Sequence, residues 1–155
     1  MNSAAGVLTW LIALAPYQVA SESPQRVEYC ALVKDPQQFA SKTVIVQARL
    51  TELRRGEWGL DSDCFQPILL AFPNDVRPKP DFQLEKTEGV RLLQQARHER
   101  RVLFRGDFVG RFDVAEPLSQ ASGHPKQATF GQSRVKMRLV LRDVQNPERI
   151  VIPGK

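Results

Sequence analysis

Apolar and polar side chains alternate along several stretches of the chain, and the longest of these runs from Val102 to Val114. A period of two residues is typical of a β-strand with one face in the core and the other in solvent. The alternation predicts three phenylalanines in the core and three charged residues in solvent: Phe104, Phe108 and Phe112 inward, and Arg105, Asp107 and Arg111 outward. Gly106 and Gly110 fall on the apolar face, where a residue without a Cβ lets a strand bend or a second segment approach closely.

Shorter segments carry further strand and helix patterns. Strands are predicted at residues 43–53, 57–60, 65–72 and 134–142, with a short terminal strand at 150–152. Helical spacing predicts a short N-terminal helix within 27–39, interrupted at Asp35-Pro36, and a second helix at 87–97. Thr87 is the expected N-cap of the second helix, and Gly89 in its first turn weakens the helical pattern.

The order of these elements predicts a mainly β fold. Three strands, a helix and two strands form the order of the oligonucleotide/oligosaccharide-binding (OB) architecture. We therefore expect a small five-stranded OB-like Greek-key barrel, with one helix between strands 3 and 4 and a short N-terminal helix. A generic β-sandwich is the alternative.

The N-terminus has the composition of an export signal. Residues 1–21 carry no Lys, Arg, Asp or Glu, and 7–15 form an apolar run that is short for a membrane span. The sequence predicts a cleaved signal peptide at 1–21, a single OB-like β-barrel domain at 22–155, a periplasmic or secreted bacterial location, and no membrane span after cleavage. An uncleaved anchor or a short buried helix are the alternatives, since no basic residue precedes the apolar run.

The chain contains two cysteines, Cys30 and Cys64. In an exported protein they most simply form one disulfide. A zinc site would need both histidines, His98 and His124, to converge on the two thiols. In a cytosolic protein the thiols would be small buried apolar groups.

Cys30 also begins the run CALVKDPQQFASKTVIV, which contains an Asp-Pro pair, an aromatic residue, a lysine before a strand, and later Gly123-His124. This pattern resembles that of small secreted bacterial proteins of unknown function with two cysteines. The turn Ala40-Ser41-Lys42 departs from the Gly-Lys usual in that group. The resemblance implies an OB-like domain and a disulfide, and it implies no catalytic residues.

The net charge of +5 fits an anionic ligand, although solubility alone also accounts for it. Four basic residues of the last long strand and its approach form a possible ligand surface together with a loop histidine: Arg134, Lys136, Arg138, Arg142 and His124. Anionic ligands or another envelope protein are the partners that this surface suggests. Export, and the lack of outward aromatic residues other than Trp58, argue against nucleic acid.

The common catalytic motifs are absent: there is no nucleophile elbow, phosphate-binding loop, zinc-protease motif or dinucleotide fingerprint. The sequence predicts no catalytic residue, metal or cofactor. The expected function is that of an exported, non-catalytic OB-like binding or interaction module of unknown ligand. The alternative is a hydrolase or ligand-modifying enzyme in which His124 meets nearby carboxylates such as Asp61 or Asp63.

Overall fold

The structure is a computed structural model that describes residues 23–116 and 129–153. Strands dominate the described residues, which confirms the mainly β prediction. The elements in chain order are β1 (Gln25–Val27), α1 (Tyr29–Lys34), the 3₁₀ turn η1 (Pro36–Phe39), β2 (Thr43–Arg54), β3 (Glu57–Asp61), β4 (Ile68–Ala71), the 3₁₀ turn η2 (Pro73–Asp75), α2 (Glu88–Ala96), β5 (Val102–Val114) and β6 (Met137–Val151).

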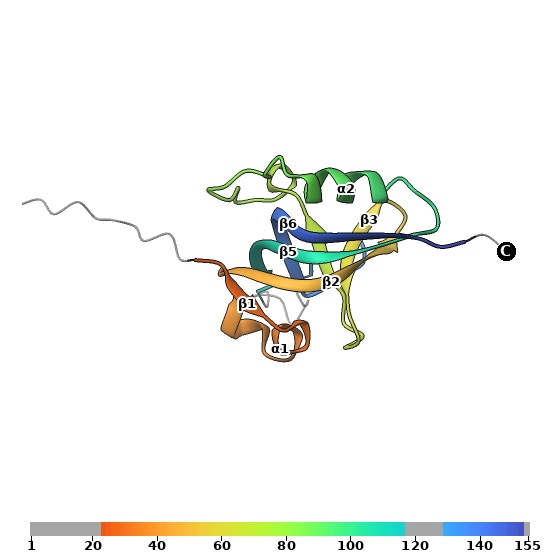
Figure 1. Ribbon diagram of the computed structural model, residues 1–155. Coiled ribbons are helices and arrows are strands. Elements are labelled where there is room, and N and C mark those ends of the chain that lie inside the picture. Colours follow the sequence, from red (N-terminus) through yellow and green to blue (C-terminus); the bar gives the residue numbers. More distant parts are fainter. Residues whose placement is uncertain (1–22, 117–128, 154–155) are drawn as a thin grey trace, which may run out of the picture.

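Within the described residues, six strands form one mixed sheet in the order β1-β2-β3-β4-β6-β5, and β2 also pairs with β5. The five strands from β2 to β6 therefore form a closed ring of pairings, but an uneven one. β5 and β6 are paired along almost their whole length, whereas β3 and β4 meet only at Gly59–Leu69 and Leu60–Ile68. In Figure 1, α2 lies above the strands, and α1 lies below them, next to the edge strand β1.

The prediction of five strands is wrong, because β1 is a sixth. β1 forms where the sequence pattern predicts no strand, and its last residue, Val27, falls within the range expected for the N-terminal helix. It runs parallel to β2 with Arg26 opposite Ile45. This strand depends on backbone pairing with β2 and not on an alternation of apolar side chains, so the sequence pattern does not predict it. The short N-terminal helix is confirmed as α1, which ends before Pro36, where η1 begins.

The final strand is longer than its pattern. The segments predicted at 134–142 and 150–152 merge into one strand, β6, which begins at Met137, continues through Pro147 and ends at Val151. The register with β5 shifts there, since Arg105 faces Glu148 while Asp107 faces Gln145. Pro147 lies in the resulting bulge, where a residue without an N–H group is tolerated.

The core assignment of β5 is confirmed for its aromatic face. Phe104, Phe108 and Phe112 are at most 1% exposed, and the rings of Phe104 and Phe108 meet edge to face with centroids 6.2 Å apart. The outward assignment is correct for Arg105, which is exposed.

The outward assignment of Asp107 is wrong, because this residue is 3% exposed. Arg26 Nη2 and Asn146 Nδ2 both donate to Asp107 Oδ2, at 3.0 and 2.8 Å. The hydrogen bond from Arg26 lowers the pKa of Asp107, against the opposing effect of burial. β1 and the bulge of β6 thus cover a carboxylate that lies on the outer face of β5.

Helix α2 and the cysteine pair follow the sequence prediction. Thr87 Oγ1 accepts a hydrogen bond from the backbone N–H of Val90 at 3.3 Å and so caps the helix. Cys30 and Cys64 form a disulfide with their Cα atoms 5.6 Å apart, a usual separation. This bond joins α1 to the connection between β3 and β4.

The two faces of β5 differ in their expected contributions to stability. Phe108→Ala should lower the free energy of unfolding by about 3–5 kcal/mol, because it opens a cavity in the core. Arg105→Ala should change it by only about 0.5 kcal/mol, because the ion pair with Glu148 is about half exposed at both side chains. Denaturant unfolding of both variants, with the disulfide intact, measures the difference; equal losses would contradict the face assignment.

Candidate functional site

The four basic residues that the sequence grouped as a ligand surface differ in their exposure and in their ion pairs. Arg134 and Lys136 are exposed. Arg142 pairs with Glu85 at 2.9 Å, and Arg138 is 15% exposed and pairs with Asp113 at 2.6 Å. Acidic residues from other segments therefore compensate the positive charge of two of the four basic residues. His124 lies outside the described residues.

Arg138 also belongs to a pocket that sequence reasoning missed. The pocket has a volume of about 280 Å³ and lies over β3 and β4, between α2 and the turn at residues 130–135. We call it the arginine–aromatic pocket and define it by the six side chains that give it its chemistry: Trp58, Phe72, Asp75, Arg97, Phe130 and Arg138.

Each of the two arginines in this pocket lies over an aromatic ring. The Arg97 guanidinium carbon is 4.8 Å from the centroid of Phe72, and that of Arg138 is 4.2 Å from the centroid of Phe130. Both separations are in the range of a cation–π contact. The rings restrict the motion of the guanidinium groups. Binding a ligand would therefore cost less side-chain entropy than binding to freely moving arginines.

Arg97 is brought to the pocket by the end of α2. It is the C-cap residue of this helix, and its stem continues the buried face of Leu93 and Ala96. Its Nε atom is buried and has no hydrogen-bond partner among the described residues. Burial lowers the pKa of the Arg97 guanidinium, and the charge of Asp75 opposes this shift.

The opposite wall of the pocket is the turn that carries Phe130. A β-bridge between Phe130 and Val135 closes this turn. The Glu57 carboxylate of β3 accepts hydrogen bonds from the backbone N–H groups of Gln132 and Ser133, at 2.8 and 2.7 Å, and from the Ser133 hydroxyl. Burial raises the pKa of Glu57, but these hydrogen bonds outweigh it and lower the pKa. Glu57 is thus occupied in fixing the turn.

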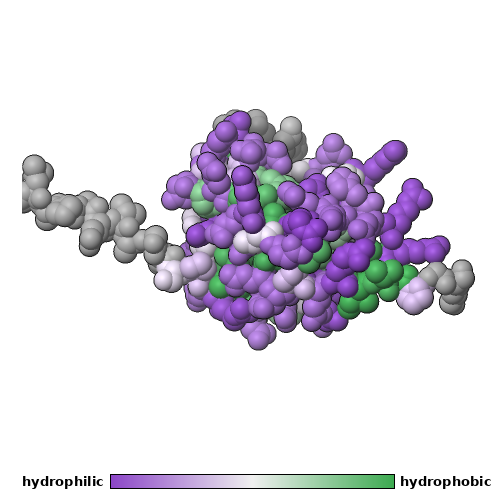
Figure 2. Space-filling view, turned by 45° about the horizontal axis from the view of Figure 1, so that its top comes forward, coloured by the Kyte–Doolittle hydropathy of each residue, from purple (hydrophilic) through white to green (hydrophobic). Residues whose placement is uncertain are grey.

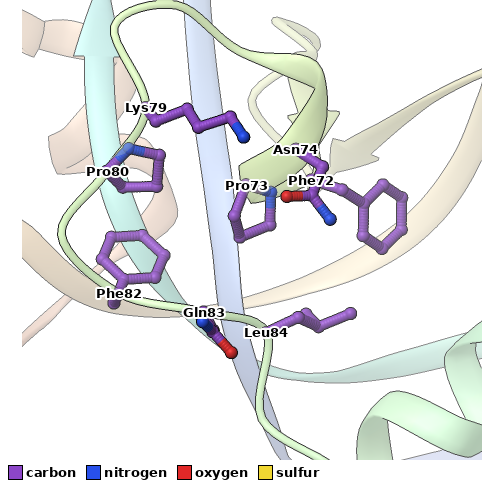
Figure 3. A pocket seen from close by; sticks show the side chains of 8 residues that line it. All are labelled: Phe72, Pro73, Asn74, Lys79, Pro80, Phe82, Gln83 and Leu84. Atoms are coloured by element: carbon purple, nitrogen blue, oxygen red, sulfur yellow. The ribbon is translucent and has the colours of Figure 1, made fainter.

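A second pocket adjoins the first at Phe72. It has a volume of about 400 Å³ and lies between η2 and the segment 79–84. Figure 3 shows Lys79 on one side of it, Phe82 beside Pro80, and the ring of Phe72 turned away from Phe82. The amides of Asn74 and Gln83 supply further polar groups, so this pocket combines one cation with apolar walls.

The carboxylates that the sequence offered for catalysis lie in a different place. Asp61 and Asp63 line a polar groove of about 300 Å³ and face Arg49 at 3.8 and 3.6 Å. The described residues contain no group of three or more His, Cys, Asp or Glu that could hold a metal. His98 follows the end of α2 and is exposed to solvent.

Comparison with known proteins finds no matching family model, no matching curated protein and no matching solved structure. In the described part of the chain, no helix has both the length and the apolar character that a membrane span requires. The geometry of the pocket is therefore the basis for a functional proposal.

Arg97 and Arg138 should differ in their effect on stability. Arg97→Met keeps an apolar stem against Phe72 and removes a buried donor without a partner, so the free energy of unfolding should stay within about 1 kcal/mol of wild type or rise. Arg138→Met leaves Asp113 without one of its two arginine partners and should lower it by about 1–3 kcal/mol. Denaturant unfolding measures both; an equal loss in the two variants would mean that Arg97 serves the fold rather than a ligand.

Proposed function

We propose that this chain is an exported, non-catalytic, OB-like binding module that holds an anionic, ring-containing ligand in the arginine–aromatic pocket. The carrying observation is the pair of guanidinium groups, each over an aromatic ring, that line one pocket. Guanidinium groups recognise carboxylates and phosphates through paired hydrogen bonds. Because Arg138 already donates its Nε and Nη2 hydrogens to Asp113, Arg97 is the main anion-binding group in this proposal. The aromatic walls, including Trp58, contact the ring faces of the ligand.

The OB-like form is supported by the order of pairings. Leaving β1 aside, the ring β2-β3-β4-β6-β5 with α2 between β4 and β5 has the sequence of elements of that architecture. β1 and the short seam between β3 and β4 are departures from it. In OB folds the face of the second and third strands and the adjoining loops bind ligands. The arginine–aromatic pocket lies over β3 and β4, the strands that hold these positions when β1 is left aside.

Export is supported by the apolar N-terminal run and by the disulfide between Cys30 and Cys64, which an oxidising compartment maintains. An acidic glycan is the ligand class that fits both this location and the pocket. It offers sugar ring faces to aromatic residues and carboxylates to arginines.

The test is a titration with tetragalacturonate, compared with its fully methyl-esterified form. Binding is followed by the fluorescence of Trp58 in a Trp10→Phe background, in which Trp58 is the single tryptophan. The acidic form should bind about tenfold more tightly than the ester, since the ester retains the rings and lacks the charges.

Arg97→Met should weaken binding of tetragalacturonate by about tenfold. The matched control is Arg91→Met, which removes an exposed arginine from the same helix and should leave the affinity unchanged. Equal affinity for the acid and the ester, equal losses in the two variants, or no binding of the acidic form at millimolar concentration would contradict the proposal.

A further inference from the structure

The β5–β6 ribbon ends in an exposed apolar tip. Ile150, Val151 and Ile152 are 41%, 60% and 52% exposed. Figure 1 shows the end of β6 extending beyond the rest of the molecule, and Figure 2 shows a hydrophobic patch where the described chain ends. Exposed apolar residues in a contiguous group indicate a contact surface more often than isolated ones do.

The tip is apolar on both of its faces. Successive residues of a strand point to opposite sides, so Ile150 and Ile152 lie on one face and Val151 on the other. No described strand flanks the ribbon here, because β2 pairs with β5 only as far as Arg105 and β4 pairs with β6 only from Arg138 to Val140. The ribbon end is thus a two-sided wedge rather than one uncovered side of a sheet.

Two arginines lie beside the tip. Arg100 and Arg101 are exposed, and neither forms an ion pair among the described residues. The Ile152 N–H donates to the carbonyl oxygen of Arg101 at 2.8 Å, which fixes the arginine segment beside the tip. The nearby acids are neutralised, since Glu99 pairs with Arg149 and Glu148 pairs with Arg105.

We propose that this tip docks into the surface of an anionic lipid bilayer, with Ile150, Val151 and Ile152 in the interfacial layer and Arg100 and Arg101 against lipid phosphates. A protein partner with a flat surface would cover one face of the ribbon and leave the other in water. A bilayer interface surrounds an inserted wedge on all sides. The interface is hydrated, so the unpaired backbone groups at the ribbon edges keep hydrogen-bond partners.

The proposal is independent of the ligand pocket and is tested on the full chain. Hydrogen exchange is measured with vesicles of phosphatidylcholine containing phosphatidylglycerol, and with vesicles of phosphatidylcholine alone. Exchange at residues 100–104 and 148–152 should slow with the anionic vesicles and not with the neutral ones. This readout is local to the tip, so attachment through the apolar run at residues 7–15 does not imitate it.

Two sets of variants are compared by co-sedimentation with the anionic vesicles. The triple change Ile150→Ser, Val151→Ser, Ile152→Ser should lower the partition coefficient by about tenfold or more. Its matched control is Phe65→Ser, which removes a ring that is 92% exposed on the β3–β4 connection and should have no effect. Arg100→Gln with Arg101→Gln should weaken binding by roughly fivefold per arginine, whereas Lys34→Gln with Arg55→Gln, at exposed positions elsewhere, should change it little.

Unchanged exchange at the tip in the presence of anionic vesicles would overturn the proposal. So would equal protection by neutral vesicles, or equal losses in the tip variant and Phe65→Ser. Protection of the tip that appears without vesicles, as the protein concentration is raised, would show instead that a second copy of the chain covers it.

Discussion

The close approach of two glycines to the backbone of β6 is the constraint on which the rest of the structure depends. A Cβ atom at Gly89 would lie 2.8 Å from the carbonyl carbon of Val144, and one at Gly110 would lie 2.9 Å from that of Val140. Carbon atoms of real side chains do not come this close to a carbonyl group. At Gly89 the absent side chain lets α2 rest directly on β6, and at Gly110 it lets β5 and β6 shift register. Because α2 ends at Arg97, its placement on β6 also places Arg97 over Phe72.

The sequence pattern correctly predicts those elements that bury one regular apolar face in the core. β5 is bounded as its period of two predicts, and its phenylalanines lie in the core, because one face of that strand is buried from Phe104 to Phe112. α2 follows its apolar spacing for the same reason. The weakness of its pattern at Gly89 has a tertiary cause, which is the contact with β6.

The sequence predictions fail where a segment distant in the chain changes the surroundings of a residue. Asp107 lies on the polar face of β5, yet Arg26 and Asn146 enclose it, and no pattern within β5 contains them. β1 has three residues and no apolar period, and its existence depends on the edge of β2. The candidate site has the same character. Arg97 and Phe72 are far apart in sequence, and Phe130 could have been suspected only as a lone aromatic residue in a polar loop. The basic residues are visible in the sequence, whereas their pairing with Asp113 and Glu85 depends on contacts between segments that are distant in sequence.

The most direct test of the constraint is the free energy of unfolding of Gly89→Ala. In an isolated helix this change stabilises by about 1 kcal/mol, because glycine is a poor helix former. The contact with Val144 predicts the opposite sign, a loss of about 1–3 kcal/mol from overpacking. Gln95→Ala, at an exposed position of the same helix, is the control and should change stability by a few tenths of a kcal/mol. A Gly89→Ala variant as stable as wild type, or more stable, would contradict the account.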